Sequence, residues 1–274
     1  MAISVSVFCI WRDSCKTIER TLKQLEDLES LLDFEFSFYF YENDSKDETP
    51  VILAQWMQTR SGNFLSEQLN AQKFGSTTDN ARMKLLCECR NKGKNLAGDN
   101  KTDYSLLMDS DVEFNNENFL LQLKELNRLG QAVMTTPNVR QPVPDYAFGI
   151  CSDSYYDVYP FRDKHGNTGL YFSDCPSYKK EDQFDWRIGK PIRCLSAFGG
   201  FAIVKSEFFN KVWWSCDIHC DHVNMCFDLG KYGSIYCVPR SKVYVGVNVK
   251  EEDLEEFKKT ASRQKEVYES NFNN

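Results

Sequence analysis

The sequence predicts an α/β protein with a Rossmann-like, mixed and mostly parallel sheet flanked by helices. Apolar segments with strand character alternate with segments of helical periodicity over residues 1–136, and such alternation is typical of a parallel sheet covered on both faces by helices. Polar residues close the first strands of this series, in the segments CIWRD, YENDSKDET and DSDVEF. Because ligands bind beyond the carboxyl ends of the strands in such sheets, these segments indicate one binding edge.

The first strand is expected at 3–11, and the first helix over 13–33. Ile18 begins the helical apolar spacing, and Asp13 or Ser14 suits the N-cap. The second strand, at 34–42, alternates two sets of side chains. One face carries Phe34, Phe36, Phe38 and Phe40, and the other carries Ser37, Tyr39 and Tyr41.

A further helix begins at Thr49 and Pro50, which suit the N-cap and N1 positions. Gly93 and Gly130 end the next two helices. The remaining elements of the first half are a helix, a strand, a helix and a strand, at 80–93, 104–108, 116–130 and 131–136.

Residues 141–195 do not continue this alternation. The stretch is rich in aromatic, turn-forming and charged residues and is long for a loop in a compact domain, which favours a binding subregion. Strand character returns at 196–204 and 233–239, and a polar helical tail is expected over 251–272.

Composition excludes several classes of function. The chain of 274 residues has a net charge of −7 and no block of Lys or Arg, which argues against nucleic-acid binding. No stretch has the length and apolarity of a membrane span, and the start lacks the basic leader of a signal peptide. The sequence does not exclude that the chain is one domain of a longer protein.

The chain has 11 cysteines, an odd number, and several lie inside apolar runs, where a free thiol behaves as a small apolar group. We therefore expect a reducing compartment, the cytoplasm, which would be a host cytoplasm if the protein is viral. Asn43 lies in a glycosylation sequon within a candidate binding loop, and a glycan there would block the loop.

Asp109, Ser110 and Asp111 follow the apolar strand YSLLM. Two carboxylates one residue apart repel each other, and a divalent cation between them removes that cost. Oxygen ligands suit Mn²⁺ or Mg²⁺, which retain waters and bridge to phosphates. The alternative is a turn that carries two solvated acids.

The stretch LLMDSDVEF resembles the Asp-x-Asp motif of GT-A fold glycosyltransferases, which use nucleotide-sugar donors. Other blocks resemble one subgroup, the capsule-associated mannosyltransferase-like enzymes of fungi and the related glycosyltransferases of large DNA viruses. These blocks are YENDSKDET, ARMKLLCECRNKG, YYDVYPFRD, SAFGGFAIV and CDHVNMCFDL. They occur in the order of that subgroup and span roughly residues 3–245.

The resemblance implies a single GT-A domain over 1–274. Its nucleotide-sugar-binding half would cover 1–140, its aromatic-rich acceptor-binding half 141–248, and a C-terminal helix 249–274. It also implies a metal site in which Asp111 binds the ion directly, while Asp109 reaches the ion, a metal-bound water or the donor ribose. Ser110 then lies against the donor.

By the same resemblance, Asp221 is the general base if the reaction inverts the anomeric centre, and otherwise orients the acceptor or donor. His222 would be a further metal ligand or would bind the diphosphate. One alternative is a structural histidine next to a helix-capping aspartate. Another is a zinc site, although its spacing departs from paired-cysteine modules; its members would be Cys216, His219, Cys220 and His222.

The donor would meet several more side chains. Glu42, Asn43 and Asp44 lie where family members contact the base and ribose, although a plain Asn/Asp/Ser turn has the same composition. Trp11 would stack on the base and Arg12 would reach a phosphate; a packed Trp and a surface Arg are the alternative.

Arg82 and Arg90 share one helix face, and the resemblance places them near the donor together with Asn91. Gly199 and Gly200 would let the sugar approach the backbone, with a β-bulge as the alternative.

The acceptor pocket is expected in the aromatic-rich stretch. Asp157, Arg162 and Asp163 would shape it, and three aromatic residues would stack on sugar rings, unless they only form a satellite core. These three are Tyr155, Tyr156 and Trp186.

The sequence thus predicts a metal-dependent hexosyltransferase that moves a hexose from a UDP- or GDP-linked sugar to a hydroxyl of a glycan. The alternatives are a non-catalytic sugar-binding module of the same fold, or a nucleotidyltransferase, for which FCIWRDSC lacks the glycine-rich loop. The donor sugar, the acceptor, the anomeric outcome and the oligomeric state stay open.

Overall fold

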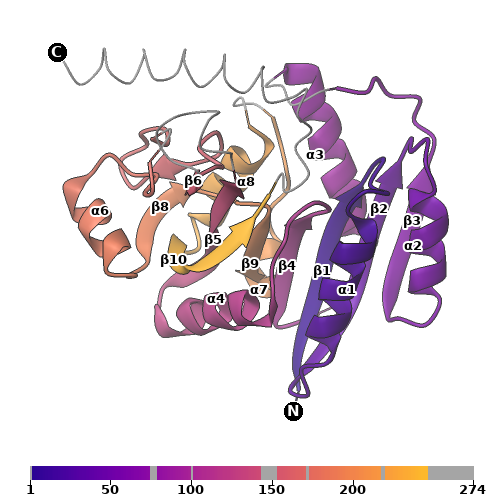
Figure 1. Ribbon diagram of the computed structural model, residues 1–274, viewed down its shortest axis with the longest axis horizontal. Coiled ribbons are helices and arrows are strands. Elements are labelled where there is room, and N and C mark those ends of the chain that lie inside the picture. The colour runs from indigo at the N-terminus through magenta and orange to yellow at the C-terminus, as the bar shows by residue number, and fades with distance from the viewer. Residues whose placement is uncertain are drawn as a thin grey trace.

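The computed structural model describes residues 2–74, 79–99, 101–142, 153–170, 173–216 and 220–245. Within these residues, ten strands form one mixed sheet whose longest parallel ladders lie among β1, β2, β4, β5 and β10 (Figure 1). The strands run in the order β3-β2-β1-β4-β9-β5-β10-β8-β7, and β6 pairs with β5. The predicted mixed, mostly parallel α/β sheet is confirmed.

The bounds of the strands are β1 (Ile3–Trp11), β2 (Phe34–Asn43), β3 (Gly62–Glu67), β4 (Tyr104–Asp109), β5 (Ala132–Pro142), β6 (Asp153–Tyr155), β7 (Arg162–Asp163), β8 (Ile192–Ser196), β9 (Phe201–Lys205) and β10 (Ser234–Tyr244). The helices are α1 (Ile18–Glu29), α2 (Thr49–Met57), α3 (Asn80–Asn95), α4 (Asn116–Arg128), α6 (Lys180–Arg187), α7 (Ser206–Phe209) and α8 (Asp221–Leu229).

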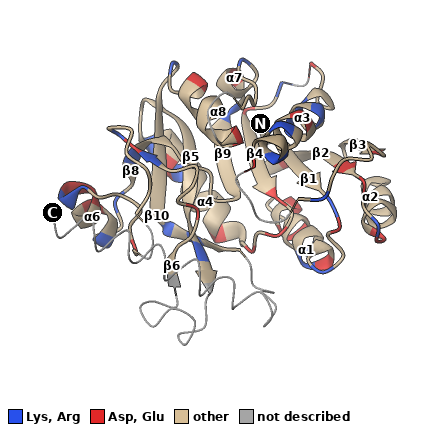
Figure 2. Cartoon of the chain, turned by 90° about the horizontal axis from the view of Figure 1, so that it is seen from above, with Lys and Arg blue, Asp and Glu red and all other residues tan. Residues whose placement is uncertain are grey.

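The helices cover both faces of the sheet. Helices α1, α2 and α4 lie on one face, and α3, α7 and α8 on the other (Figures 1 and 2). The alternation predicted for β2 agrees with this. Phe36 packs against Phe119 of α4, whereas Tyr39 stacks on Phe8, which contacts Phe209 of α7. Each face of β2 therefore buries its aromatic side chains under a different helix layer.

Strands β1, β2 and β4 are parallel neighbours and end at the same edge. Trp11 pairs with Glu42, and Ile10 pairs with Asp109. Strand β9 is antiparallel to both β4 and β5. Its first residue, Phe201, therefore lies beside the end of β4, and the preceding Gly199–Gly200 turn reaches the same edge. The three polar segments converge as the sequence predicts.

Some elements differ from the sequence-based expectations. Helix α1 begins at Ile18, and its N-cap is Thr17 rather than Asp13 or Ser14. Asp13 has a left-handed backbone (φ 49°), and its carboxylate instead accepts the N–H of Lys46. A turn carrying the two glycines interrupts the strand expected at 196–204.

Strand β3, which pairs in parallel with β2, was not predicted from the sequence. The tail and the C-terminal helix expected over 249–274 lie outside the described residues. Among the described helices, none combines the length and apolarity needed to cross a bilayer. The division into halves near residue 140 stays a prediction.

Candidate active site

A pocket of about 610 Å³ opens at the carboxyl edge of β1 and β4, between α1 and α3. This volume lies in the usual range for a small-molecule site. Six cations and three acids are among its lining residues, although the chain as a whole is acidic. The cations are Arg12, Lys16, Arg20, Lys73, Arg82 and Arg90, and the acids are Asp13, Asp109 and Asp111. The pocket thus presents a local excess of positive charge, suited to an anionic ligand.

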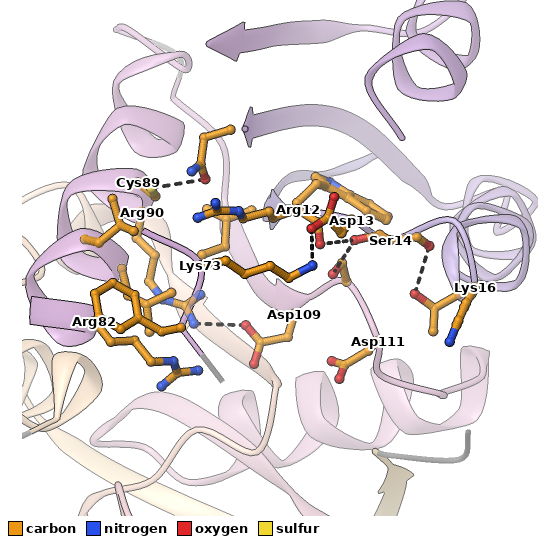
Figure 3. A pocket seen from close by; sticks show the side chains of 18 of the residues that line it. Arg12, Asp13, Ser14, Lys16, Lys73, Arg82, Cys89, Arg90, Asp109 and Asp111 are labelled. Atoms are coloured by element: carbon orange, nitrogen blue, oxygen red, sulfur yellow. Dashed lines mark hydrogen bonds and ion pairs between the residues drawn. The ribbon is translucent and has the colours of Figure 1, made fainter. Parts of the chain in front are cut away.

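Charged residues of both signs lie at the ends of β1, β2 and β4 (Figure 2). In the close-up, Asp109 and Asp111 extend from the end of β4, with Arg82, Arg90 and Lys73 around Asp109 (Figure 3). The sequence predicted Arg82, Arg90 and both acids for this place. It did not single out Lys73, which forms an ion pair with Asp13 and arrives from the segment after β3.

Arg90 connects two acids that are far apart in the chain. Its Nε donates to Asp221 Oδ2 at 2.8 Å, and its Nη2 donates to Asp109 Oδ1 at 2.9 Å. The Arg90 and Asp221 side chains are buried, at 9% and 5% exposure, whereas that of Asp109 is 34% exposed. Arg90 therefore fixes the Oδ1 atom of Asp109, and the exposed part of this carboxylate remains open to the pocket.

Asp221 is an ionised partner in this network. Burial would raise its pKa, but His222 and Arg90 lower it. Burial also lowers the pKa of His222 to about 4, so that ring is neutral near pH 7. Arg90 is consequently the cation that keeps Asp221 charged. Neither Asp221 nor His222 is among the residues that line the pocket, and the role of Asp221 as a base stays a prediction.

Asp111 is exposed at the mouth of the pocket. Loss of hydration between the pocket walls, and then repulsion from Asp109, raise its pKa to about 6. Arg20 of α1 donates to the Asp111 carbonyl at 2.9 Å and so fixes the turn after β4. Two neighbouring acids in such surroundings favour a divalent cation.

The donor set fits Mn²⁺ or Mg²⁺ better than zinc. Among the described residues, no three His, Cys, Asp or Glu side chains form a group that could hold a metal ion. Mg²⁺-like ions need only one or two carboxylates, because water and substrate phosphates complete their shell. Of the zinc alternative, Cys216, Cys220 and His222 form no such group, and His219 lies outside the described residues.

His222 is packed rather than open. Its Nδ1 accepts the Trp214 Nε1–H at 3.3 Å, and Phe198 stacks on the ring at 3.7 Å. The other nitrogen, Nε2, is buried without a hydrogen-bond partner among the described residues and lies 3.5 Å from Asp221 Oδ2. This arrangement resembles the structural-histidine alternative, and a metal-binding role stays a prediction.

The side chains of the acidic loop after β2 mostly form hydrogen bonds with other parts of the protein. The Asp44 carboxylate accepts the N–H groups of Asn70 and Ala71, at 2.8 and 3.1 Å. Arg12 donates to the carbonyls of Ala71 and Gln72, at 3.0 and 3.3 Å. Asp44 and Arg12 thus hold the segment that follows β3. Their predicted contacts with a nucleotide would need groups already engaged here.

Glu42 and Asn43 are also buried, at 0% and 5% exposure. Glu42 accepts the N–H of Ser45 and the hydroxyl of Ser66, whereas Asn43 borders the pocket. Trp11 is 1% exposed and packs edge-on against Phe40, so it offers no open face for stacking on a base.

The Gly199–Gly200 turn touches the Asp109 backbone. Both glycines have left-handed φ values, 68° and 64°. The N–H of Gly199 donates to Asp157 at 2.7 Å, and the carbonyl of Gly200 accepts the N–H of Asp109 at 2.9 Å. The glycines thus bring the turn before β9 against Asp109 and Asp157. The Gly199 N–H bonds to Asp157 and is not left open for a sugar.

We expect Gly200→Ala to lower the free energy of unfolding by about 2–4 kcal/mol. A left-handed alanine costs about 1–2 kcal/mol, and overpacking costs about as much again. An added Cβ would lie 2.5 Å from Val112 Cγ2. Gly98→Ala is the matched control for urea unfolding, because Gly98 has a similar φ of 54° with open space around it. Equal losses in the two variants would show that the contact with Val112 is unimportant.

The expected acceptor residues divide into two groups. Tyr155 and Trp186 are buried and pack against each other, so they behave as a satellite core. Arg162 donates to the carbonyls of its own turn, and Asp163 accepts from the following turn. Tyr156 is exposed, and Asp157 is partly buried beside the glycine turn. Only this last pair lies near the acids of the pocket.

No protein-family model matches the sequence, and no curated protein matches it. Solved structures are similar in fold. A mannosyltransferase, PcManGT from Pyrobaculum calidifontis, solved with GDP-Man and Mn²⁺, aligns over 94% of this chain at 11% identity with a TM-score of 0.54. This chain has the GT-A fold. It spans 61% of that neighbour's length.

Two further GT-A fold structures align less closely. S. aureus TarS 1-349, solved with UDP-GlcNAc, aligns over 96% of this chain and 66% of its own, at 14% identity and a TM-score of 0.47. The glucosyl-3-phosphoglycerate synthase from Mycobacterium tuberculosis, solved with Mn²⁺, UDP and glucosyl-3-phosphoglycerate, aligns over 96% of this chain and 78% of its own, at 12% identity and a TM-score of 0.46.

Proposed function

We propose that this chain is a metal-dependent glycosyltransferase. It transfers a hexose from a UDP- or GDP-linked sugar to a hydroxyl of a glycan acceptor. The observation that carries the proposal is the pair Asp109 and Asp111 at the open end of β4, inside a pocket with an excess of cations. The same pocket holds the two features that a nucleotide diphosphate needs, carboxylates for a bridging cation and basic side chains for phosphate.

Asp109 and Asp111 would hold Mn²⁺ or Mg²⁺, which when bound acts as a Lewis acid on the departing diphosphate. Arg90 holds Asp109 in its orientation. Lys73 and Arg82, which also line the pocket, attract the diphosphate and offset its charge as the sugar–phosphate bond breaks. The Gly199–Gly200 turn lies against Asp109, which lines the pocket.

Further features of the proposal rest on the sequence. The fungal capsule-associated and large-virus enzymes remain the proposed relatives, and the cytoplasm remains the proposed compartment. In the described residues all ten cysteines are free. The proposed partners are a nucleotide-sugar donor and a glycan, with no nucleic acid.

The test measures donor binding through the change in the melting temperature of the protein. UDP-glucose, UDP-GlcNAc and GDP-mannose are added with Mn²⁺ or with EDTA. At 100-fold saturation, a bound donor stabilises the folded state by about 2.7 kcal/mol. We expect one donor to stabilise the protein with Mn²⁺ and to lose that effect in EDTA.

We expect Asp111→Asn to lose the Mn²⁺-dependent stabilisation and to lower donor turnover by about 100-fold, because one of two anionic oxygen ligands becomes neutral. Glu117→Gln removes an exposed acid of α4 and serves as control. No stabilisation by any donor, with metal present, would refute the proposed function. A nucleoside triphosphate as the one stabilising ligand would favour the nucleotidyltransferase alternative.

A further inference from the structure

Asp157 is an acid beside the Gly199–Gly200 turn, and the proposed mechanism does not yet use it. Like Asp221, it is not among the residues that line the pocket. It follows β6, and its Oδ2 accepts the Gly199 N–H at 2.7 Å. Its other oxygen, Oδ1, has no partner among the described residues, and the side chain is partly exposed. One half of this carboxylate is therefore fixed, and the other half accepts no hydrogen bond from the described residues.

The glycine turn links Asp157 to Asp109. Gly199 donates to Asp157, and the carbonyl of Gly200 accepts the N–H of Asp109 at 2.9 Å. An added Cβ on Gly200 would lie 3.5 Å from Asp109 Oδ2, which shows how closely this turn lies over that carboxylate. Asp157 thus lies on the far side of a two-residue turn from the Asp-x-Asp motif.

Asp221, which the sequence resemblance selects as the base, has different surroundings. Its Oδ2 accepts from Arg90 at 2.8 Å, and its Oδ1 accepts the Cys220 thiol at 3.6 Å. It is 4% exposed. Both of its oxygens are engaged, and an ion pair with a buried guanidinium makes a carboxylate a weaker base.

We infer that Asp157, held by Gly199, is the group that takes the proton from the acceptor hydroxyl, and that Asp221 positions Arg90. This inference rests on the proposed function. In the step, the acceptor oxygen forms a bond to the anomeric carbon, and the bond from that carbon to the diphosphate oxygen breaks. The electron pair leaves with the diphosphate, and the acceptor proton passes to Asp157 Oδ1. This direct displacement, with Asp157 as the base, inverts the anomeric centre.

The electrostatics of Asp157 agree with this role. Burial raises its pKa to about 7, opposed by the Gly199 N–H, and the charges of Asp109 and Asp221 act in the same direction as burial. Arg90 lowers it. The other titratable groups facing Asp157 are phenols on its own segment and thiols on or beside α8, namely Tyr155, Tyr156, Cys220 and Cys226. A base with a pKa near the working pH transfers protons most effectively.

The experiment measures nucleoside diphosphate release from UDP-glucose, UDP-GlcNAc and GDP-mannose with Mn²⁺, with water or methyl mannoside as acceptor. Wild type is compared with Asp157→Asn, Asp157→Ala and Asp221→Asn between pH 5.5 and 8.5. Asp185→Asn, which changes a partly exposed acid paired with Lys190, is the control. Donor binding is followed in parallel by melting temperature.

For Asp157→Asn we expect a rate lowered by about 100-fold or more, the usual contribution of a general base, with unchanged donor binding. The rise of the rate with pH near 7 should disappear in this variant, and formate should partly restore Asp157→Ala. Asp221→Asn should be slow at every pH but keep the wild-type pH dependence.

The outcomes separate the two proposals. If Asp157→Asn keeps its rate and pH profile, or if Asp221→Asn alone abolishes the pH dependence, the role of Asp157 is refuted while the transferase proposal stands. The role of Asp157 as the base is also refuted if the wild-type protein binds a donor but releases nucleoside diphosphate with neither water nor methyl mannoside as acceptor. Failure of wild type to bind any donor refutes both.

Discussion

Arg90→Met is expected to lower the free energy of unfolding by about 3–5 kcal/mol and to abolish metal-dependent donor binding. Arg90 is 9% exposed and bonds to two acids, one of them the buried Asp221. Its guanidinium also lies 5.3 Å from the centre of the Phe198 ring. Removing one partner of a buried ion pair leaves an uncompensated charge, which accounts for a loss of this size. Urea unfolding at pH 7.5 measures it.

Two further variants show whether the buried charge causes the loss. Arg128→Met changes an arginine that is 53% exposed and pairs with Glu125, and we expect a loss below about 1 kcal/mol. Arg90→Met combined with Asp221→Leu removes both charges, so it should be more stable than Arg90→Met alone. A double variant that is as unstable as the sum of the single ones would mean that packing, rather than charge, carries the effect.

The binding edge could be predicted from the sequence because its causes are local. Apolar strands that end in polar residues identify β1, β2 and β4, and parallel pairing then places their ends side by side. Asp109 and Asp111 border the pocket for this reason. Such reasoning needs only the order of elements along the chain. Arg82 and Arg90 also line the pocket, but they lie on α3, and only the family resemblance placed them near the donor.

The partners of these residues could not be predicted in the same way. Arg90 and Asp221 are 131 positions apart, and no periodicity connects them. Asp44 looks like a ligand-binding residue in the sequence, yet it holds Asn70 and Ala71. That contact depends on β3, a short strand of largely exposed residues with weak alternation. A polar residue at a strand end therefore indicates the place of a site more reliably than its own role there.

Asp157 illustrates the same limit. The sequence grouped it with Arg162 and Asp163 as residues that shape an acceptor pocket. The structure separates them, because Arg162 and Asp163 hold their own turns while Asp157 meets the glycine turn beside Asp109. What distinguishes Asp157 is a hydrogen bond to a residue 42 positions later. Tertiary packing alone supplies that information.

We expect the protein to lose about 5–10 kcal/mol of unfolding free energy between pH 7.5 and pH 9.5 under reducing conditions. Seven buried thiols other than Cys220, which adjoins Asp221, cause this loss: Cys9, Cys87, Cys89, Cys175, Cys194, Cys226 and Cys237. Burial raises the pKa of each one, to about 11 for Cys226 and about 12 for Cys89, Cys175 and Cys237.

The sign follows from proton linkage. The folded-state pKa of these thiols is raised above the unfolded value of about 8.5. Their stabilising contribution is therefore complete below pH 8.5 and is lost as the pH rises toward the folded-state pKa. Each buried thiol costs up to about 1.4 kcal/mol per pH unit in that window. Such a total approaches the whole stability of an ordinary domain.

Lys94 changes the pH dependence of the unfolding free energy in the opposite direction and so reduces the net loss. Burial lowers its pKa to about 8, so the unfolded chain binds the extra proton above that pH, and this one group gains stability as the pH rises. Seven thiols outweigh one lysine. In urea unfolding with dithiothreitol, Cys226→Ala should flatten the alkaline slope by about 1 kcal/mol per pH unit, whereas Cys15→Ser, which changes an exposed thiol, should leave it unchanged. A stability that stays level up to pH 9.5 in both would mean that the buried thiols ionise without unfolding the chain.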